Sequence, residues 1–101
     1  MVTSPVKRLK RLLTSGSLWL YILSLTEKGK IYAYELDEKI AKQFDFRPNK
    51  IMNYVVLYKL ENEGLIASEF QERRKYYNIT KKGKQTLQQA REYFKTLAKK
   101  L

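Results

Sequence analysis

The stretch YVVLYKLENEGLIASEFQERRKYYNITKKG, residues 54–83, decides the fold, because the spacing of its apolar residues changes at Gly64. Before this glycine, the segment IMNYVVLYKLENE (residues 51–63) has the length and spacing of a helix. Glycine readily adopts the left-handed backbone that ends many helices. After it, apolar residues alternate along two short segments, and QERR (residues 71–74) lies between them. The stretch therefore predicts a helix that stops at Gly64 and a two-stranded hairpin.

Two more helices are predicted upstream. Pro5 can open the first, which continues as an apolar stripe from Ser17 and ends at Gly29. The second covers residues 33–44, where apolar residues recur four apart and most charged residues lie off that line. Pro48 suits the first turn of the helix that follows, because the N–H that proline lacks would be unpaired there. The two stripes consist of Leu18, Tyr21, Ile22 and Leu25, and of Leu36, Ile40 and Phe44.

Residues 81–101 return to helical spacing, so the element order is three helices, a two-stranded hairpin and a closing helix. The short connection FDFRPN (residues 44–49) predicts a helix-turn-helix, with the hairpin beside it as a wing. The fold class is therefore α+β and mainly α, a winged helix-turn-helix. We expect residues 1–80 to form the DNA-binding winged unit, and residues 81–101 to form a C-terminal dimerisation helix within the same structural unit.

The charge balance points to a polyanionic partner. The chain has 101 residues, enough for one domain with a single modest core, and 44% of them are hydrophobic. Lys and Arg number 21 against 10 Asp and Glu, which gives a net charge of +11. Such a field attracts polyanions and speeds their association. Nucleic acid is the first candidate partner, and an anionic membrane surface is the second.

The chain lacks several residue types that enzyme active sites and metal sites commonly use. The chain has no cysteine and no histidine, which removes disulfides, thiolate ligands and the most common general base. Its four glycines form no phosphate-binding loop. We therefore expect no enzyme activity, metal or cofactor. The apolar run LWLYILSL (residues 18–25) follows basic residues as a signal peptide would, but no cleavage site follows it and it is too short to span a bilayer. We expect a soluble, cytoplasmic protein.

Three segments of the chain form a recognisable set: AYEL (residues 33–36), YVVLYKLENEGLI (residues 54–66) and RRKYYNITKKG (residues 73–83). Together they resemble the PadR family of winged-helix transcription regulators. The likeness extends from about the first helix to the start of the last. Ala33 stands where the family commonly has glycine, and the hairpin tip lacks the glycines often found there, which predicts a shorter or stiffer wing.

The N-terminal half of the third helix holds the candidate base-reading residues. Asparagine can bond adenine through two hydrogen bonds in the major groove, lysine can reach guanine or phosphate, and tyrosine can donate to phosphate. The alternative interpretation is a solvated helix face. The candidates are Asn49, Lys50, Asn53 and Tyr54, and both Leu57 and Leu60 are expected in the core.

The hairpin holds a second group of candidate DNA contacts, Arg73, Arg74 and Lys75. Alternation places Ile66 and Phe70 on one face of the first strand. In the second strand it places Tyr77 and Ile79 on one face, with Tyr76 and Asn78 on the other. Strands held in this way can present a cationic tip to the phosphate backbone or the minor groove. The alternative is that Glu69 and Glu72 simply pair with these cations at the surface.

The last helix carries a heptad seam of Leu87, Ala90, Phe94, Leu97 and Leu101. The seam lasts only about two heptads, so a helix folded onto its own domain is the alternative to a dimer. The resemblance to the PadR family favours a homodimer built from this helix and the first one. It also implies a small-molecule effector in a cavity lined by Trp19 at that interface, although a lone tryptophan is more often part of the core.

Together these features predict a sequence-specific regulator that binds double-stranded DNA as a homodimer and represses transcription by occupying its operator. A sequence-tolerant architectural or RNA-binding protein would exploit the same positive charge. A protein-interaction module with an acidic partner is a third possibility.

Overall fold

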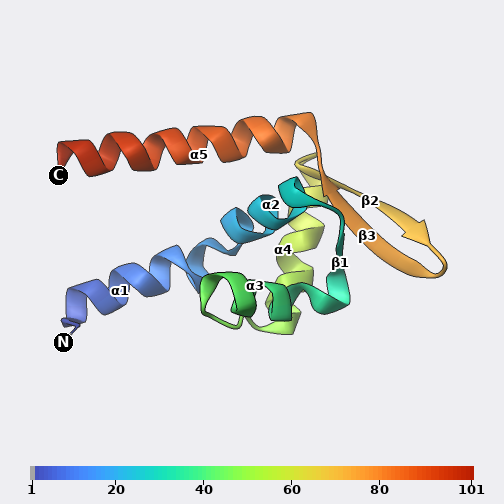
Figure 1. Cartoon of the computed structure of the whole chain (residues 1–101), viewed down its shortest axis with the longest axis horizontal. Helices are drawn as coiled ribbons and strands as arrows, with labels where there is room; N and C mark the ends of the chain where they lie inside the picture. Colours follow the sequence, from blue (N-terminus) through green and yellow to red (C-terminus); the bar gives the residue numbers. More distant parts are fainter. Residues whose placement is uncertain (1) are drawn as a thin grey trace.

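Helix α2 (Leu18–Lys28) lies at the centre of the computed structural model, which describes residues 2–101 (Figure 1). It contributes five buried residues, and α3, α4, α5 and the sheet pack around it. Ile22 and Leu23 of this helix are fully buried, as are Leu36 and Ile40 of α3. The remaining elements are α1 (Ser4–Leu13), β1 (Ile31–Tyr32), α3 (Leu36–Phe44), α4 (Lys50–Asn62), β2 (Ile66–Gln71), β3 (Arg74–Ile79) and α5 (Lys81–Lys100), with short 3₁₀ turns at Ser15–Ser17 and Ala33–Glu35.

The first predicted helix is divided in two. Helix α1 ends at Leu13, and α2 begins only at Leu18. Between them, Thr14 donates its hydroxyl hydrogen bond to the Lys10 carbonyl and Ser17 donates to that of Leu12. Short hydroxyl side chains compete in this way with the backbone hydrogen bonds of a helix. The single helix expected from Pro5 to Gly29 is therefore wrong, and α1 projects from the body without a buried residue.

The predicted hairpin forms, and it carries a third strand. The sheet is antiparallel with strand order β1-β3-β2, in which Ile31 pairs with Tyr77 and Ile66 pairs with Ile79. Strand β1 has only two residues, too few for an alternating pattern to reveal it. The mainly helical α+β class is confirmed, with a three-stranded sheet in place of a two-stranded one.

The connection between α3 and α4 is held by a partly buried ion pair. Asp45 ends α3 in the left-handed conformation, at φ 62°. Arg47 then reaches back to Asp37 in the first turn of α3, with 2.8 Å between nitrogen and oxygen. Asp37 is only 4% exposed, so its carboxylate is buried. The pair fixes the turn that aims α4.

Helix α4 begins two residues after Pro48. Asn49 is the N-cap, and its side-chain oxygen accepts hydrogen bonds from the backbone N–H groups of Ile51 and Met52. The sequence placed Pro48 in the first turn of this helix, and that prediction is wrong. Pro48 precedes the cap residue Asn49. An asparagine cap satisfies donors that the helix itself leaves unpaired.

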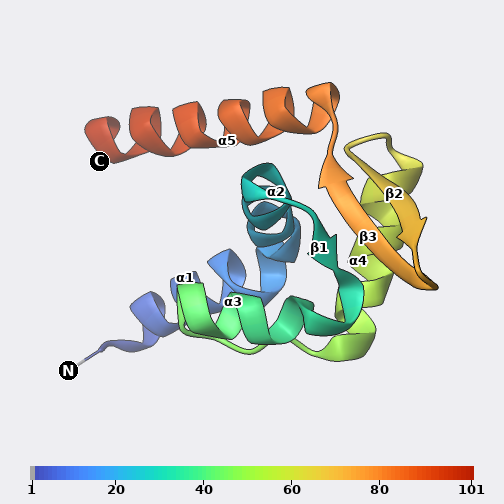
Figure 2. The same cartoon turned by 45° about the vertical axis from the view of Figure 1, so that its right-hand side comes forward.

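Helix α5 is anchored to the body at its first turn. Thr80 caps it by accepting from the Gly83 N–H at 3.0 Å, and donates its hydroxyl to the Gly64 carbonyl at 2.6 Å. A Cβ at Gly83 would lie 2.0 Å from the Leu65 carbonyl oxygen, so only glycine permits this approach. The rest of α5 extends away from the wing, as α1 does (Figures 1 and 2). Among residues 2–101, no helix combines the length and the apolar character that crossing a membrane requires.

Candidate nucleic-acid interface

Helix α4 has apolar residues on both of its faces. Asn53, Leu57 and Leu60 are buried, at the spacings of four and three that mark one side of a helix. Ile51, Val55 and Tyr58 lie on the opposite side, and Ile51 and Tyr58 are 74% and 71% exposed. The expected burial of Leu57 and Leu60 is confirmed. The outward face is therefore made of aliphatic and aromatic side chains.

Asn53 points into the core, at 2% exposed. Its side-chain oxygen has no hydrogen-bond partner among the residues that the structure describes. The expectation that this side chain is exposed and reads a base is wrong, because Asn53 shares the inward line of α4 with Leu57 and Leu60. Its place near the N-terminus of the helix suggested a reader, but the helical phase turns it away from solvent.

The other three candidates of this helix are exposed. The oxygen of Asn49 is occupied by the cap, at 2.8 Å from the Ile51 nitrogen and 3.2 Å from the Met52 nitrogen. Two-point bonding to adenine requires that oxygen as an acceptor, so the side chain offers its amide N–H groups instead. Lys50 and Tyr54 extend from the first two turns of α4. These positions match the end of a recognition helix that enters the major groove.

Three tyrosines connect the start of α4 to the wing, and we call them the tyrosine ladder: Tyr34, Tyr32 and Tyr76. The ring centroids of Tyr34 and Tyr32 are 6.0 Å apart, and those of Tyr32 and Tyr76 are 5.7 Å apart. The three rings come from the 3₁₀ turn before α3, from β1 and from β3. They bring segments far apart in the sequence into one row.

Each ring of the tyrosine ladder has a cation over its face. Lys50 lies 4.6 Å from the centroid of Tyr34, Arg74 lies 5.1 Å from that of Tyr32, and Lys30 lies 4.9 Å from that of Tyr76. Cation–π contacts at exposed sites contribute about 0.5–1 kcal/mol each. The ladder therefore restrains positive side chains in a line between α4 and the wing.

The three cations of the hairpin have different surroundings. Arg73 lies in the turn, where both it and Glu72 have positive φ angles of 73° and 50°. Arg74 stacks on Tyr32, as part of the ladder. Lys75 turns toward α4, with its nitrogen 3.6 Å from Glu61.

No ion pair joins these cations to Glu69 or Glu72 within residues 2–101, so the predicted alternative names the wrong partners. The neighbouring Tyr77, and then Glu61, raise the pKa of Lys75, so its ammonium stays charged at neutral pH. Arg73 and Arg74 are thus the exposed cations of the wing.

The wing extends beyond the core that supports its base. Ile66 is 1% exposed and Tyr77 is 5% exposed, so both are buried. Phe70 shares a strand face with Ile66 but is 71% exposed, because it lies near the tip of the hairpin. Figure 1 shows the two strands projecting past the helices. Each strand of the wing has six residues, and the turn accepts non-glycine residues at positive φ. The shorter or stiffer wing expected from the missing glycines stays a prediction.

The sequence interpretation missed Lys30, Tyr32, Tyr34 and Tyr76 as members of this surface. The signal available was the number of tyrosines, eight in 101 residues, with four of them near the two strands that pair as β1 and β3. Without the register of β1, nothing in the sequence places residues 30–34 beside residues 74–76. The sheet supplies that adjacency.

The family comparison now decides the identity. A model of the transcriptional regulator PadR-like family matches residues 22–89, which is more than half of the chain. The chain belongs to the PadR-like family of transcriptional regulators. The predicted resemblance is confirmed, and the match spans α2 to the first half of α5. Comparison with curated protein sequences gives no match.

Solved structures share the fold of this PadR-like chain. A transcriptional regulator from Clostridium thermocellum is 30% identical, with a TM-score of 0.77 over 98% of this chain and 93% of that one. A PadR family transcriptional regulator from Eggerthella lenta is 26% identical, with a TM-score of 0.80 over 93% of this chain and 86% of that one. F93 from STIV, a winged-helix DNA-binding protein, is 18% identical with a TM-score of 0.71 over 83% and 92%, and shows the fold alone. The winged-helix prediction is confirmed.

The heptad seam of the PadR-like α5 divides between two environments. Leu87 is 3% exposed in the core of its own domain, and Ala90 is half-buried. Phe94 and Leu97 are 38% and 39% exposed, and Leu101 is almost fully exposed. The first part of the seam therefore follows the predicted alternative of intramolecular packing, and the second part is free for another contact.

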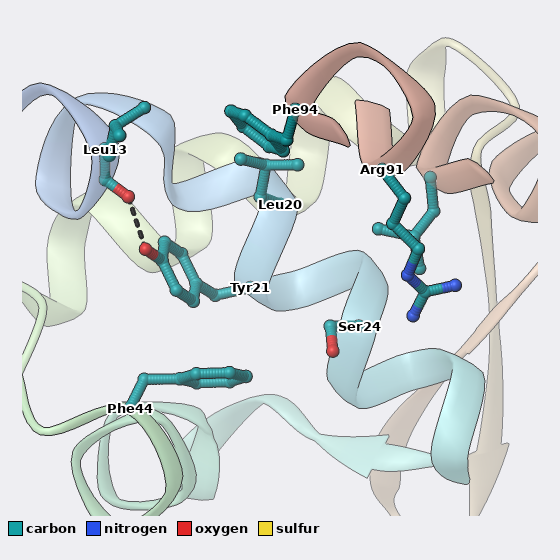
Figure 3. Close-up of a pocket in the computed structure, with 8 residues that line it drawn as sticks. Leu13, Leu20, Tyr21, Ser24, Phe44, Arg91 and Phe94 are labelled. Carbon is teal, nitrogen blue, oxygen red and sulfur yellow. Dashed lines mark hydrogen bonds between the residues drawn. The ribbon is translucent and has the colours of Figure 1, made fainter. Parts of the chain in front are cut away.

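An apolar hollow of about 360 Å³ lies between α2 and the middle of α5 (Figure 3). Phe94 stands beside Leu20 at its upper edge, and Phe44 of α3 lies below Tyr21. Tyr21 donates its hydroxyl hydrogen bond to the Leu13 carbonyl, which ties the end of α1 to this hollow. Burial raises the pKa of Tyr21. The C-terminal end of α1 and the middle of α5 thus border one apolar surface.

Trp19 lines a different hollow, of about 420 Å³, together with Leu18, Met52 and Val56. This hollow shares no lining residue with the one between α2 and α5. Trp19 is half-buried and packs against the core. A small-molecule effector near Trp19 stays a prediction, and the site would adjoin α4.

Proposed function

We propose that this PadR-like protein binds specific sites in double-stranded DNA as a homodimer, and that it represses transcription by occupying them. The observation that carries the proposal is the continuous row of cations and rings from Lys50 through the tyrosine ladder to Arg74. Phosphate contacts position a protein on a duplex, and base contacts near the start of the recognition helix provide specificity.

The arrangement favours a duplex over a single strand. With the start of α4 in the major groove, the wing extends along the duplex toward the flanking backbone or minor groove. Single-stranded nucleic acid is bound by stacking bases on free aromatic faces. In the tyrosine ladder each ring already has a cation over one face, which favours phosphate binding and disfavours stacking of bases.

The dimer is supported by the apolar residues that are exposed along α1 and along the C-terminal half of α5 with Leu101 after it. Phe94, Leu97 and Leu101 form one part of this surface. Val6, Leu9, Leu12 and Leu13 of α1 form the other. Both helices leave the body on the side away from the wing (Figure 2). A symmetric partner on that side would leave both copies of α4 free to reach half-sites about 34 Å apart.

Selection of bound fragments from a random duplex pool, at physiological salt, tests the proposal. We expect a common site with two-fold symmetry, bound at least about 10³-fold more tightly than random duplex. Recovery of fragments with no common sequence would favour the sequence-tolerant architectural protein. Stronger binding to RNA than to duplex DNA would favour the RNA-binding alternative, and a nuclease-resistant acidic protein partner would favour the interaction module.

The wing contact is tested with Arg74→Ala, measured against both the selected site and random duplex. Loss of one phosphate contact should weaken both by similar factors and reduce the slope of log affinity against log salt by about 0.9 for each copy bound. Lys75→Ala is the matched control, because its ammonium is directed at Glu61. It should change the slope much less. An Arg74→Ala protein with the parent slope would remove the wing from the proposed interface.

A further inference from the structure

The outward face of α4 offers few groups that can pair with the polar edge of a base. Ile51 is the second residue of the helix, at the end expected in the major groove, and it is 74% exposed. Val55 and Tyr58 follow it on the same side, one and two turns later. Asn53, the residue whose chemistry suits adenine, is buried on the other side. An aliphatic side chain therefore occupies a position where a recognition helix usually carries a polar side chain that bonds to base edges.

The charges around Ile51 indicate a polyanion as the partner of this face. Lys50 precedes it in the chain and lies over Tyr34, the first ring of the tyrosine ladder. The ladder continues to Arg74, and the whole chain has a net charge of +11. A partner whose rim is negative and whose centre offers small apolar groups complements this surface. The major groove of DNA fits, because thymine presents its C5 methyl group there between the two phosphate backbones.

We propose that Ile51 recognises thymine in each half-site by contact with its C5 methyl group. The inference rests on the proposed function and deepens it, since it assigns the specificity at one position to an apolar contact. Adenine, guanine and cytosine present no methyl group in the major groove. The selected operator should therefore carry an A·T pair, with the same strand polarity in each half-site, at the position that faces Ile51.

Replacement of single thymines by deoxyuridine in the selected operator tests the contact directly. Uracil keeps the O4 acceptor and the pairing edge of thymine and lacks only the methyl group. Each half-site should contain one sensitive position. Replacing the thymine at that position in one half-site removes one buried methyl group and should weaken binding about fourfold. Replacement in both half-sites should weaken it about fifteenfold, because the two contacts are far apart and independent. Thymines elsewhere in the operator should tolerate the change.

Ile51→Ala assigns the effect to one side chain. In this variant the ratio of affinities for the thymine and uracil operators should fall to about one at the sensitive position. Tyr58→Ala is the matched control, since it removes a similarly exposed side chain from the same face two turns away. It should keep the fourfold ratio.

Three outcomes would overturn the inference. An operator that is bound selectively but is insensitive to uracil at every position would remove the methyl contact and leave the proposed function standing. If Tyr58→Ala abolishes the ratio of affinities for the thymine and uracil operators and Ile51→Ala preserves it, the methyl contact belongs to Tyr58 and not to Ile51. An Ile51→Ala protein with parent DNA affinity but altered self-association would show that this face binds a second copy. Absence of any selective duplex binding would instead overturn the proposed function itself.

Discussion

Helices α4 and α5 differ in the arrangement of their apolar residues, which lie on one side of α5 and on two opposite sides of α4. In α5, the apolar residues follow one line from Leu87 to Leu101, and the opposite side is charged or polar. In α4, Leu57 and Leu60 face the core while Ile51 and Tyr58 face solvent. An apolar stripe identifies the core-facing side of a helix only where the other side is polar. The mixed pattern of α4 is what concealed the phase of Asn53.

Helices α5 and α4 therefore expose apolar surface in two different ways. The free half of α5 continues a seam that its first half already uses within the domain. The free face of α4 lies opposite its core-facing side and has the cations of the tyrosine ladder beside it. A second copy of the chain suits the first surface, and nucleic acid suits the second.

The largest effect is expected at the anchor of α5. Gly83→Ala would place a Cβ 2.0 Å from the Leu65 carbonyl oxygen and 2.7 Å from Ile79. Because the closer contact is backbone, the chain must shift, and we expect a loss of about 3 kcal/mol or more in the free energy of unfolding. Urea unfolding followed by circular dichroism measures it.

Gly29→Ala is the control for this change. A methyl group added at Gly29 would have no heavy atom within 4 Å, and the φ of 165° at this residue is extended backbone. We expect a change of less than about 1 kcal/mol. Equal stabilities of the two variants would show that the contact at Gly83 does not anchor α5.

The next largest effect is expected at the free half of α5. Phe94→Lys would place an unpaired charge in the proposed dimer interface, and we expect self-association to weaken by on the order of 100-fold, about 2.7 kcal/mol. Sedimentation across micromolar concentrations measures it. Gln89→Lys adds the same charge on an exposed residue of the opposite side and should leave association intact. A parent chain that is monomeric at these concentrations contradicts the homodimer.

A moderate effect is expected at the ion pair that aims α4. Arg47→Ala leaves the 4% exposed carboxylate of Asp37 without its partner. The arginine side chain is 59% exposed, so water screens the pair, and we expect a loss of about 1–2 kcal/mol rather than the larger value of a fully buried pair. Thermal unfolding at neutral pH measures it, with Lys39→Ala, an exposed residue of α3, as control. Similar midpoints for both variants would contradict this role.

The smallest effect on DNA binding is expected at Asn53. Asn53→Ala should alter the affinity of the folded protein for its operator by less than about twofold, because the side chain faces the core. The prediction concerns DNA affinity only and sets no value for the thermal unfolding midpoint of this variant. Operator titrations well below that midpoint measure the affinity, with Ile51→Ala run in parallel. A loss of tenfold or more for Asn53→Ala alone would reverse the two faces assigned to α4.

The sequence predicted the elements that repeat a pattern and missed those that depend on distant contacts. The stop at Gly64 and the hairpin followed from local spacing, and alternation placed Tyr77 on the buried face of its strand. Leu87, which the heptad pattern assigned to the dimer seam, lies in the core of its own domain. Strand β1 has two residues and exists because β3 pairs with it. The break before Leu18 depends on hydroxyl groups that bond back to the helix.

The candidate site was predictable in outline only. The basic wing and the start of α4 were located by composition and by the family resemblance. The tyrosine ladder was not, because its order depends on the register of Tyr32 with Tyr76. The partner of Lys75 was also missed, since Glu61 lies in another element and the sequence offered nearer carboxylates. Pairing between distant segments is the information that local patterns lack.

The attachment of α5 makes that helix a lever. It is 20 residues long, or about 30 Å, and its last buried residue is Leu87 in the second turn. In a dimer joined through the far half of α5, a tilt of about 7° at the attachment displaces the winged unit by about 3.5 Å, which is one base-pair step. In the proposed dimer, the tightness of the Gly83 contact with Leu65 would therefore set how much the distance between the two winged units varies.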